Sequence, residues 1–221
     1  MAKAKRKRTA GKARPRKGGK GDSGHAAVAA AMRLAARLGW RNVTLDAVAA
    51  ECGMATEELR KDYPSRAALL AGFARMIDGK VLEAGTVERG AGTARDRLFE
   101  AMMRRYEALV PYREAIARIA ADAPRDPLAL LCLAEPMRRS MAWMLEAAGI
   151  PNGGPLGLLK AKGLALVHLA VMRVWLNDTS PDLAQTMAAL DRALKFVEPI
   201  AETLFGGRWP GRSEMPAKKA S

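Results

Sequence analysis

The sequence is poor in the side chains that bind metals or act as nucleophiles. Its 221 residues include only two cysteines and two histidines. Cys52 and Cys132 each lie in an apolar helical pattern, which favours buried thiols in a reducing compartment over a disulfide. His25 and His168 are far apart and have no clustered cysteines or carboxylates beside them, so we expect no metal site.

The motifs of common enzyme classes are also missing. No glycine-rich phosphate loop follows a strand pattern, and no local arrangement indicates a Ser-His-Asp or Cys-His pair. We therefore expect no enzyme, no catalytic residue and no cofactor. Convincing strand patterns are missing as well, so the sequence predicts an all-α protein of about nine helices.

No apolar run is typical of a secretory signal or of an uninterrupted membrane span. The basic N-terminus has no apolar stretch behind it. Residues 158–176 are the most apolar segment, but Lys160, Lys162, His168 and Arg173 interrupt it. This pattern favours a helix that its neighbours cover almost all round over a membrane span. We expect the protein in the cytoplasm.

Acidic residues are scarce at both ends of the chain. Residues 1–20 contain ten Lys or Arg and no acid, and residues 206–221 contain four Lys or Arg and one acid. The net charge of +14 therefore lies mainly at the ends, and we expect residues 1–22 and 206–221 to be disordered basic tails. Such tails bind nucleic-acid phosphates without sequence preference. Non-specific nucleic-acid binding through the tails alone, or contact with an anionic membrane surface, is an alternative role.

A helix-turn-helix pattern occupies residues 44–70. Thr44 fits the N-cap of a first short helix, and Gly53 fits its end, where a positive φ is needed. Thr56 can cap a second short helix, and Ser65 can cap a third. The second helix of such a motif lies in the DNA major groove.

This segment resembles the DNA-binding domain of the TetR family of bacterial regulators. The matching motifs are the opening T-L-x-x-V-A, the C-G-M at the turn and the closing D-Y-P-S-R-A-A-L-L. The resemblance implies a TetR-like fold, a homodimer and double-stranded DNA as the partner. We expect Thr56 and Arg60 at base edges, because Arg can make a bidentate contact with guanine. The residues that we expect at phosphates are Thr44, Lys61, Tyr63 and Arg66.

The DNA-binding domain is predicted to span residues 23–85. Its first helix is capped by Ser23, and a connecting helix over residues 65–83 ends it. The resemblance implies that this connecting helix transmits ligand-driven movement to the DNA-binding head. Three glycines between residues 85 and 92 mark a domain boundary, and residues 93–205 form a helical domain for ligand binding and dimerisation.

The last long helix of the C-terminal domain is predicted to begin at Ser180, with Pro181 in its first position. Earlier in this domain, Pro136 falls inside a helix and should kink it. The last two helices form the dimer interface in TetR-like proteins, which the resemblance implies here; a stripe that serves only the monomer core is the alternative. The predicted interface residues are Leu183, Met187, Leu190, Leu194 and Val197.

Large or flexible apolar side chains are frequent in the C-terminal domain. They either fill the core or line a pocket between helices for a small apolar ligand. A histidine in such a helix, as His168 is, is more often a core residue with satisfied hydrogen bonds than a ligand or a base. The predicted pocket residues are Met102, Met103, Tyr106, Trp143, Met144, His168, Met172 and Trp175.

A second resemblance concerns the C-terminal half. The run VMRVWLNDTSPDLAQTMAALDRAL at residues 171–194 is similar to the end of the lipid-binding accessory proteins of ubiquinone biosynthesis, which share the TetR fold. R-D-R-L-F-E at residues 95–100 and M-R-R-Y-E-A-L at residues 103–109 look similar too. This resemblance implies that the protein binds an isoprenoid lipid and presents it to a hydroxylase. The acids in the predicted recognition helix fit this alternative.

Overall fold

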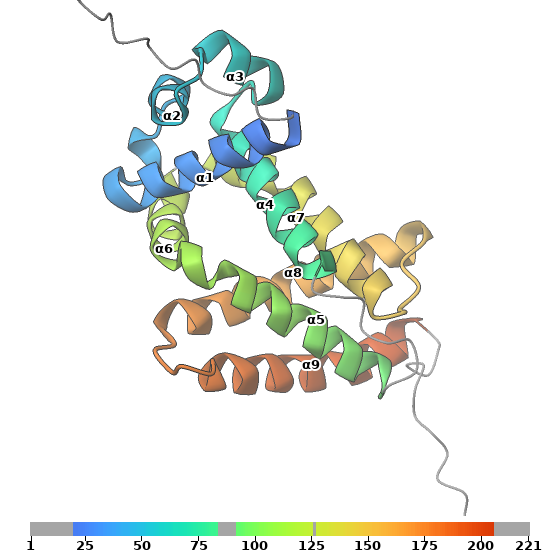
Figure 1. Ribbon diagram of the computed structural model, residues 1–221. Coiled ribbons are helices and arrows are strands. Elements are labelled where there is room, and N and C mark those ends of the chain that lie inside the picture. The colour runs from blue at the N-terminus through green and yellow to red at the C-terminus, as the bar shows by residue number, and fades with distance from the viewer. Residues whose placement is uncertain (1–19, 84–91, 126, 206–221) are drawn as a thin grey trace, which may run out of the picture.

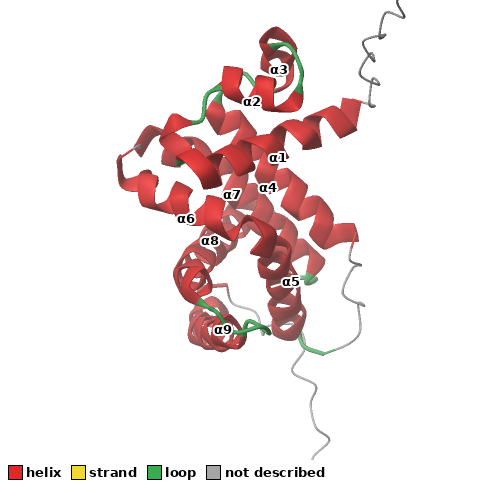
Figure 2. Ribbon diagram, turned by 60° about the vertical axis from the view of Figure 1, so that its left-hand side comes forward, coloured by secondary structure: helices red, strands yellow, loops and turns green. Residues whose placement is uncertain are grey.

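The computed structural model describes residues 20–83, 92–125 and 127–205, and these ranges contain helices and no strand (Figures 1 and 2). The predicted all-α fold is confirmed over them. The two basic ends, residues 1–19 and 206–221, and most of the glycine-rich boundary loop lie outside the described residues. The nine α-helices of the described ranges are α1 Lys20–Leu38, α2 Leu45–Cys52, α3 Thr56–Asp62, α4 Arg66–Glu83, α5 Ala94–Leu109, α6 Arg113–Asp122, α7 Pro127–Ala147, α8 Gly154–Asn177 and α9 Ala184–Phe205. Three short 3₁₀ helices join them at η1 Trp40–Asn42, η2 Val110–Tyr112 and η3 Ala123–Arg125.

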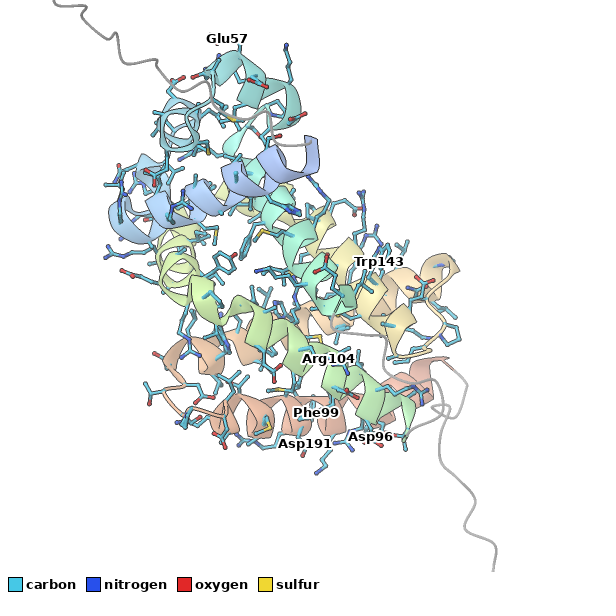
Figure 3. All side chains as sticks on the ribbon, viewed as in Figure 1. Glu57, Asp96, Phe99, Arg104, Trp143 and Asp191 are labelled. Carbon is cyan, nitrogen blue, oxygen red and sulfur yellow. The ribbon has the colours of Figure 1, made fainter. Side chains whose placement is uncertain are left out.

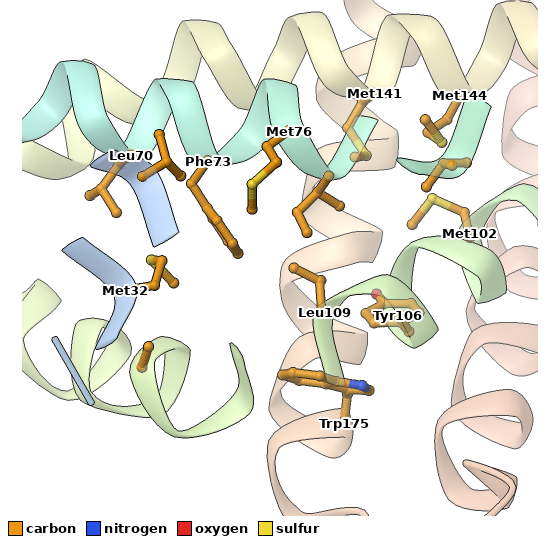
Figure 4. Packing of buried hydrophobic residues seen from close by; sticks show 14 of the residues in the cluster. Met32, Leu70, Phe73, Met76, Met102, Tyr106, Leu109, Met141, Met144 and Trp175 are labelled. Carbon is orange, nitrogen blue, oxygen red and sulfur yellow. The ribbon is translucent and has the colours of Figure 1, made fainter. Parts of the chain in front are cut away.

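The helices form a small head, made of α1, α2, α3 and η1, and a larger helical body. Figure 1 shows α1, α2 and α3 at one end of the molecule and α5, α8 and α9 at the other, with α4 and α7 running between them. A single cluster of buried apolar side chains extends from α1 to α9. Figure 4 shows part of it, with Met32 from the head, Phe73 from α4 and Trp175 from α8. Head and body therefore share one core.

The ends of α2 and α4 follow the local sequence. The Thr44 hydroxyl accepts a hydrogen bond from the backbone N–H of Ala47 at 3.1 Å, and Gly53 ends α2 with φ 67°. The Ser65 hydroxyl accepts from the N–H of Ala68 at 3.1 Å. These predicted caps are confirmed, because each depends only on residues within one turn of the helix end.

Two other predicted caps are wrong. α1 begins at Lys20, so Ser23 lies inside the helix, and the expected tail is helical over residues 20–22. α3 begins at Thr56 itself, and Ala55 takes the N-cap position without a side-chain hydrogen bond. Tertiary contacts within the head, such as those of buried Leu59, hold α3 in place instead of a side-chain cap.

The start of α9 also differs from the prediction. α9 begins at Ala184, and residues 181 and 182 form a turn before it. Asp178 provides the ordering contacts, because its carboxylate accepts from the N–H of Thr186 at 2.8 Å and from the Thr186 hydroxyl at 2.7 Å. Ser180 still contributes, since its hydroxyl accepts from the N–H of Ala184 at 2.9 Å.

α8 is less covered than the sequence indicates. Its length and composition are sufficient for a membrane span, yet only 33% of its most apolar window is buried. One side packs against α7 and α9 through residues such as Leu164, Val171 and Trp175. The other side exposes Leu159, Leu166 and Leu169. The expectation of a helix covered all round is therefore wrong for this single chain.

Candidate DNA-binding head and ligand cavity

The α2–turn–α3 motif lies at the tip of the molecule. Glu57, in the first turn of α3, marks the end of the head that is farthest from α9 (Figure 3). Among the residues predicted to contact DNA, Thr44, Arg60 and Lys61 are exposed and Thr56 is half-buried. The structure therefore brings these four side chains to one end of the molecule, where a duplex can reach them.

Tyr63 and Arg66 serve the interior of the head instead. Tyr63 is buried, and its hydroxyl donates to the carbonyl of Gly24 at 3.3 Å. Gly72 provides the space for its ring, since a Cβ there would lie 2.7 Å from the Tyr63 Cε1. The Arg66 Nη1 donates to the carbonyls of Trp40 and Arg41 at 3.2 and 3.1 Å. These polar groups hold α4 against α1 and η1, and a contact of Tyr63 or Arg66 with phosphates stays a prediction.

The charge of α3 is slightly negative. Its exposed side chains include Glu57, Glu58 and Asp62 against Arg60 and Lys61. The two glutamates suit the positive end of the helix dipole, which stabilises α3, but they repel phosphates. α3 itself therefore offers no net positive charge to a phosphate backbone, and the largest group of lysines and arginines in the sequence lies in residues 1–20.

A cavity of about 140 Å³ lies in the body behind the head. It is bounded by α4, α5, α6, α7 and α8, so every long helix of the body except α9 contributes to it. Its lining residues are Leu70, Phe73, Ala74, Arg105, Leu109, Ile116, Ile119, Leu133, Pro136, Met137, His168 and Met172. Ten of these twelve side chains are apolar, which suits a small apolar ligand.

Only two of the predicted pocket residues line this cavity, namely His168 and Met172. Trp143 is 49% exposed on the outer side of α7 (Figure 3), so its prediction as a pocket residue is wrong. The other five are buried in the apolar core around the cavity, as Figure 4 shows for four of them. These five are Met102, Met103, Tyr106, Met144 and Trp175.

The sequence prediction missed Arg105, the only charged residue of the lining. Arg105 is 3% exposed and forms an ion pair with Asp78 of α4, which also accepts a hydrogen bond of 2.5 Å from the Ser140 hydroxyl of α7. A signal for it exists in the sequence. Arg105 comes three residues after Met102 and four before Leu109, so it lies on the buried stripe of α5.

His168 is buried beside this ion pair. Its Nδ1 lies 3.0 Å from the Tyr106 hydroxyl, and that hydroxyl lies 3.1 Å from the His168 carbonyl oxygen. Burial, together with the positive charge of Arg105, lowers the pKa of His168 well below its ordinary value. Burial also raises the pKa of the Tyr106 hydroxyl. Both groups are therefore neutral at physiological pH.

No model of a known protein family matches the sequence, and no curated protein matches it either. Solved structures do match. A TetR transcriptional regulator from Nitrosomonas europaea is 21% identical with a TM-score of 0.62, and the match covers 79% of this chain and 97% of that one. A TetR regulator from Rhodococcus sp. RHA1 is 19% identical with a TM-score of 0.56 over 81% and 97% of the two chains. A TetR-family regulator from Streptomyces coelicolor is 12% identical with a TM-score of 0.55 over 84% of each chain. The chain has the TetR-like fold.

The TetR-like fold confirms the first resemblance at the level of architecture. The matched regulators span the head and the body together, since nearly the whole of the Nitrosomonas and Rhodococcus chains is covered. The second resemblance, to the accessory proteins of ubiquinone biosynthesis, finds no support in these matches.

The predicted dimer stripe faces the interior of the TetR-like body. Leu183, Leu190 and Leu194 are buried, and Met187 and Val197 are half-buried against the same core. Leu183, Leu190 and Leu194 are therefore taken up by contacts within the single chain, where α9 packs against α5 and α8, and a role of Met187 and Val197 at an interface stays a prediction. The alternative, a stripe that serves the core of the single chain, is the one that the structure supports.

Two connections join the cavity to the head. α4 lines the cavity with Leu70 and Phe73 and begins at Arg66, which holds η1 of the head. At the end of α6, the carboxylate of Asp122 accepts a hydrogen bond from the N–H of Arg41 at 3.1 Å. α4 and α6 therefore both bind the backbone between α1 and α2.

Proposed function

We propose that this chain is a TetR-family transcriptional regulator that binds double-stranded DNA as a homodimer in the cytoplasm. The observation that carries the proposal is the exposed α2–turn–α3 motif at the tip of a TetR-like fold, with a cavity behind it. In helix-turn-helix proteins, the second helix of the motif reads the major groove. The first residues of α3 and its exposed Arg60 are in the position for this reading.

Individual contacts follow from exposure and chemistry. Arg60 is the candidate for a bidentate hydrogen bond to guanine, and Thr56 is the candidate for a second base edge. Lys61 and Thr44 contact phosphates. The lysines and arginines of residues 1–20 supply the larger part of the non-specific attraction, because α3 carries three acids against two bases.

The cavity size supports a small ligand. A volume of about 140 Å³ is below the range of about 300 to 1,000 Å³ that drug-sized ligands occupy. An isoprenoid lipid is larger still, so the cavity does not favour the lipid-carrier alternative. A ligand that prefers one arrangement of α4 and α6 would change the distance between the two heads of the dimer, and with it the affinity for DNA.

The exposed apolar side of α8 supports the homodimer. Leu166 is 69% exposed, and on α9 Phe196 is 72% exposed. Leu159, Leu166 and Leu169 recur at helical spacing, so they form one stripe along α8. A second copy of the chain, packed against α8 and α9, would remove this apolar surface from water.

Sequence-specific binding is the first property to test. Full-length protein is titrated at physiological salt against the DNA upstream of its own gene and against a scrambled duplex of the same composition. We expect the wild type to prefer the native duplex. Arg60→Ala should weaken binding to that duplex by about tenfold or more, because a bidentate contact with guanine is worth about 1–3 kcal/mol.

The matched control for this experiment is Arg118→Ala. Arg118 is an exposed arginine of α6, away from the motif, and its loss changes the net charge equally. The control should keep the wild-type preference. Equal binding of both duplexes by the wild type would refute sequence reading and would leave the basic ends as the source of DNA affinity.

A further inference from the structure

The cavity offers a ligand two side chains that can form hydrogen bonds. Arg105 and His168 line it, and the ten other lining side chains are apolar. The two are close together. The charge of Arg105 acts on the His168 ring, and the same ring is contacted by Tyr106, which follows Arg105 in the sequence. The chemistry of these two side chains therefore selects the polar part of any ligand.

The hydrogen bonds of Tyr106 fix where the proton of His168 lies. The Tyr106 hydroxyl has one proton and two contacts, to the His168 carbonyl at 3.1 Å and to the His168 Nδ1 at 3.0 Å. The carbonyl can only accept, so both contacts are hydrogen bonds only when the hydroxyl donates to the carbonyl and accepts from an Nδ1–H. In this neutral tautomer the Nε2 carries a lone pair, and His168 offers the cavity an acceptor.

Arg105 offers a donor. Its Nη1 is used by the ion pair with Asp78, whereas its Nε–H is buried and has no hydrogen-bond partner among the described residues. A buried donor without a partner is uncommon in folded proteins, because its loss of hydration is not offset. A ligand oxygen that accepts from this N–H would remove that cost.

The charges around the cavity favour a neutral ligand. Asp78 balances Arg105, and the His168 ring is neutral, so an anion in the cavity would lie among apolar side chains without a free counter-charge. The volume of about 140 Å³ suits a benzene-sized body, since an engineered apolar cavity of about 150 Å³ binds benzene.

We propose that the cavity binds a small neutral alcohol of the phenol class, whose hydroxyl donates to the Nε2 of His168 and accepts from the Nε–H of Arg105. The apolar body of the ligand lies among Phe73, Ile116 and Met137. The inference rests on the proposed function only in treating this cavity as the ligand site of the regulator; the binding chemistry stands on the cavity itself.

Calorimetric titration of the full-length protein with three probes tests the proposal. The probes are phenol, toluene, which has the same size but no hydroxyl, and benzoate, which is an anion. Phenol should bind at least about tenfold more tightly than either of the others, because only phenol pairs both polar groups. Equal binding of phenol and toluene, tighter binding of benzoate, or no binding of phenol would overturn the proposal.

Three variants test the two polar side chains. His168→Asn keeps a donor toward Tyr106 but loses the acceptor, and Arg105→Lys keeps the charge opposite Asp78 but loses the Nε–H. Each should reduce phenol affinity by about tenfold toward that of toluene, while toluene binding stays nearly constant. Met172→Leu, in the same lining but apolar, should keep the phenol preference. Near-ultraviolet circular dichroism shows that each variant is folded, and an unchanged phenol preference in a folded His168→Asn protein would contradict the proposal.

The failure of this inference can be told apart from the failure of the proposed function. Phenol binding is measured without DNA, and sequence preference is measured without phenol. Phenol selectivity with no DNA preference would support the proposed binding chemistry of the cavity and refute the proposed function as a regulator. DNA preference without phenol selectivity would support the regulator and overturn the proposed binding chemistry of the cavity.

Discussion

His168 shows how its neighbours can fix the charge of one residue. Its ring is 1% exposed and lies next to Arg105, so the pKa of the imidazole is well below its ordinary value. The unfolded chain, by contrast, takes up a proton on a histidine near pH 6.5. Because the folded protein binds that proton less readily, the free energy of unfolding is highest above pH 6.5 and falls as the pH decreases below it.

This residue gives a prediction about pH. Between pH 6.5 and pH 5.5, His168 should lower the free energy of unfolding by about 1 kcal/mol, which is what one histidine that stays neutral in the folded state contributes over that range. Urea unfolding at the two pH values measures the change in the wild type and in His168→Asn. In His168→Asn, the free energy of unfolding should fall by about 1 kcal/mol less than in the wild type over the same pH range. The same pH dependence in both proteins would show that the folded state protonates His168 readily.

Tyr63 and Arg66 show that the direction of a side chain depends on its tertiary neighbours. Their sequence motif predicts DNA contacts, but their side chains turn toward α1 and η1. Cys52 behaves similarly, because it is half-buried rather than fully buried and its thiol donates to the carbonyl of Ala26 at 3.6 Å. The side chain of Cys132 lies outside the described residues. In each described case, the direction of the side chain depends on which helix lies opposite.

At the scale of the helix, the junction of α8 and α9 is ordered by one carboxylate. Asp178 is fully buried and accepts hydrogen bonds from the backbone N–H and hydroxyl groups of both Ser180 and Thr186. Burial by itself raises the pKa of Asp178, but these hydrogen bonds outweigh it and hold the pKa below the ordinary range. The stability that they add is present above about pH 4 and is lost as the pH falls further.

Removal of this carboxylate should be costly. Asp178→Ala leaves the buried N–H and hydroxyl of Thr186 without an acceptor, so we expect a loss of about 3 kcal/mol in the free energy of unfolding at pH 7. Asp182→Ala is the matched control, because Asp182 is exposed and makes only a 3.3 Å contact with the N–H of Ala184. Chemical denaturation measures both variants. Equal effects of the two substitutions would show that the Asp178 network adds no stability.

At the scale of the whole molecule, α8 exposes an apolar stripe of the kind that a partner chain covers. Leu159, Leu166 and Leu169 are large apolar residues on a helix that the chain covers on one side only. We expect a second copy of the chain to cover them in solution. In the predicted stripe on α9, Leu183, Leu190 and Leu194 already form the core of the single chain.

The oligomeric state tests this expectation. Leu166→Glu should convert the dimer into a monomer at micromolar concentration, because it places a charge in the middle of the apolar stripe. Leu131→Glu is the control, as Leu131 is 70% exposed on α7, a different surface. Analytical ultracentrifugation measures the mass of both variants. A wild type that is monomeric, or a Leu166→Glu variant that stays dimeric, would rule out this interface.

The sequence by itself determined the helical class and much of the motif at the tip. Thr44, Gly53 and Ser65 act within one turn of a helix end, so their roles depend on nearby residues and can be read from the chain. Periodicity likewise predicts that Leu190 and Leu194 belong to one apolar stripe. The charge of the ends follows from composition alone.

Only the tertiary structure decided what each apolar or polar stripe faces. Periodicity groups residues on one side of a helix, but it does not say whether that side meets the core, a cavity or a second chain. Met102 and His168 looked alike as pocket candidates, yet one packs in the core and the other lines the cavity. Arg105 and Asp78, which pair across α5 and α4, are 27 residues apart in the sequence. Such contacts depend on how whole helices pack, which no local pattern contains.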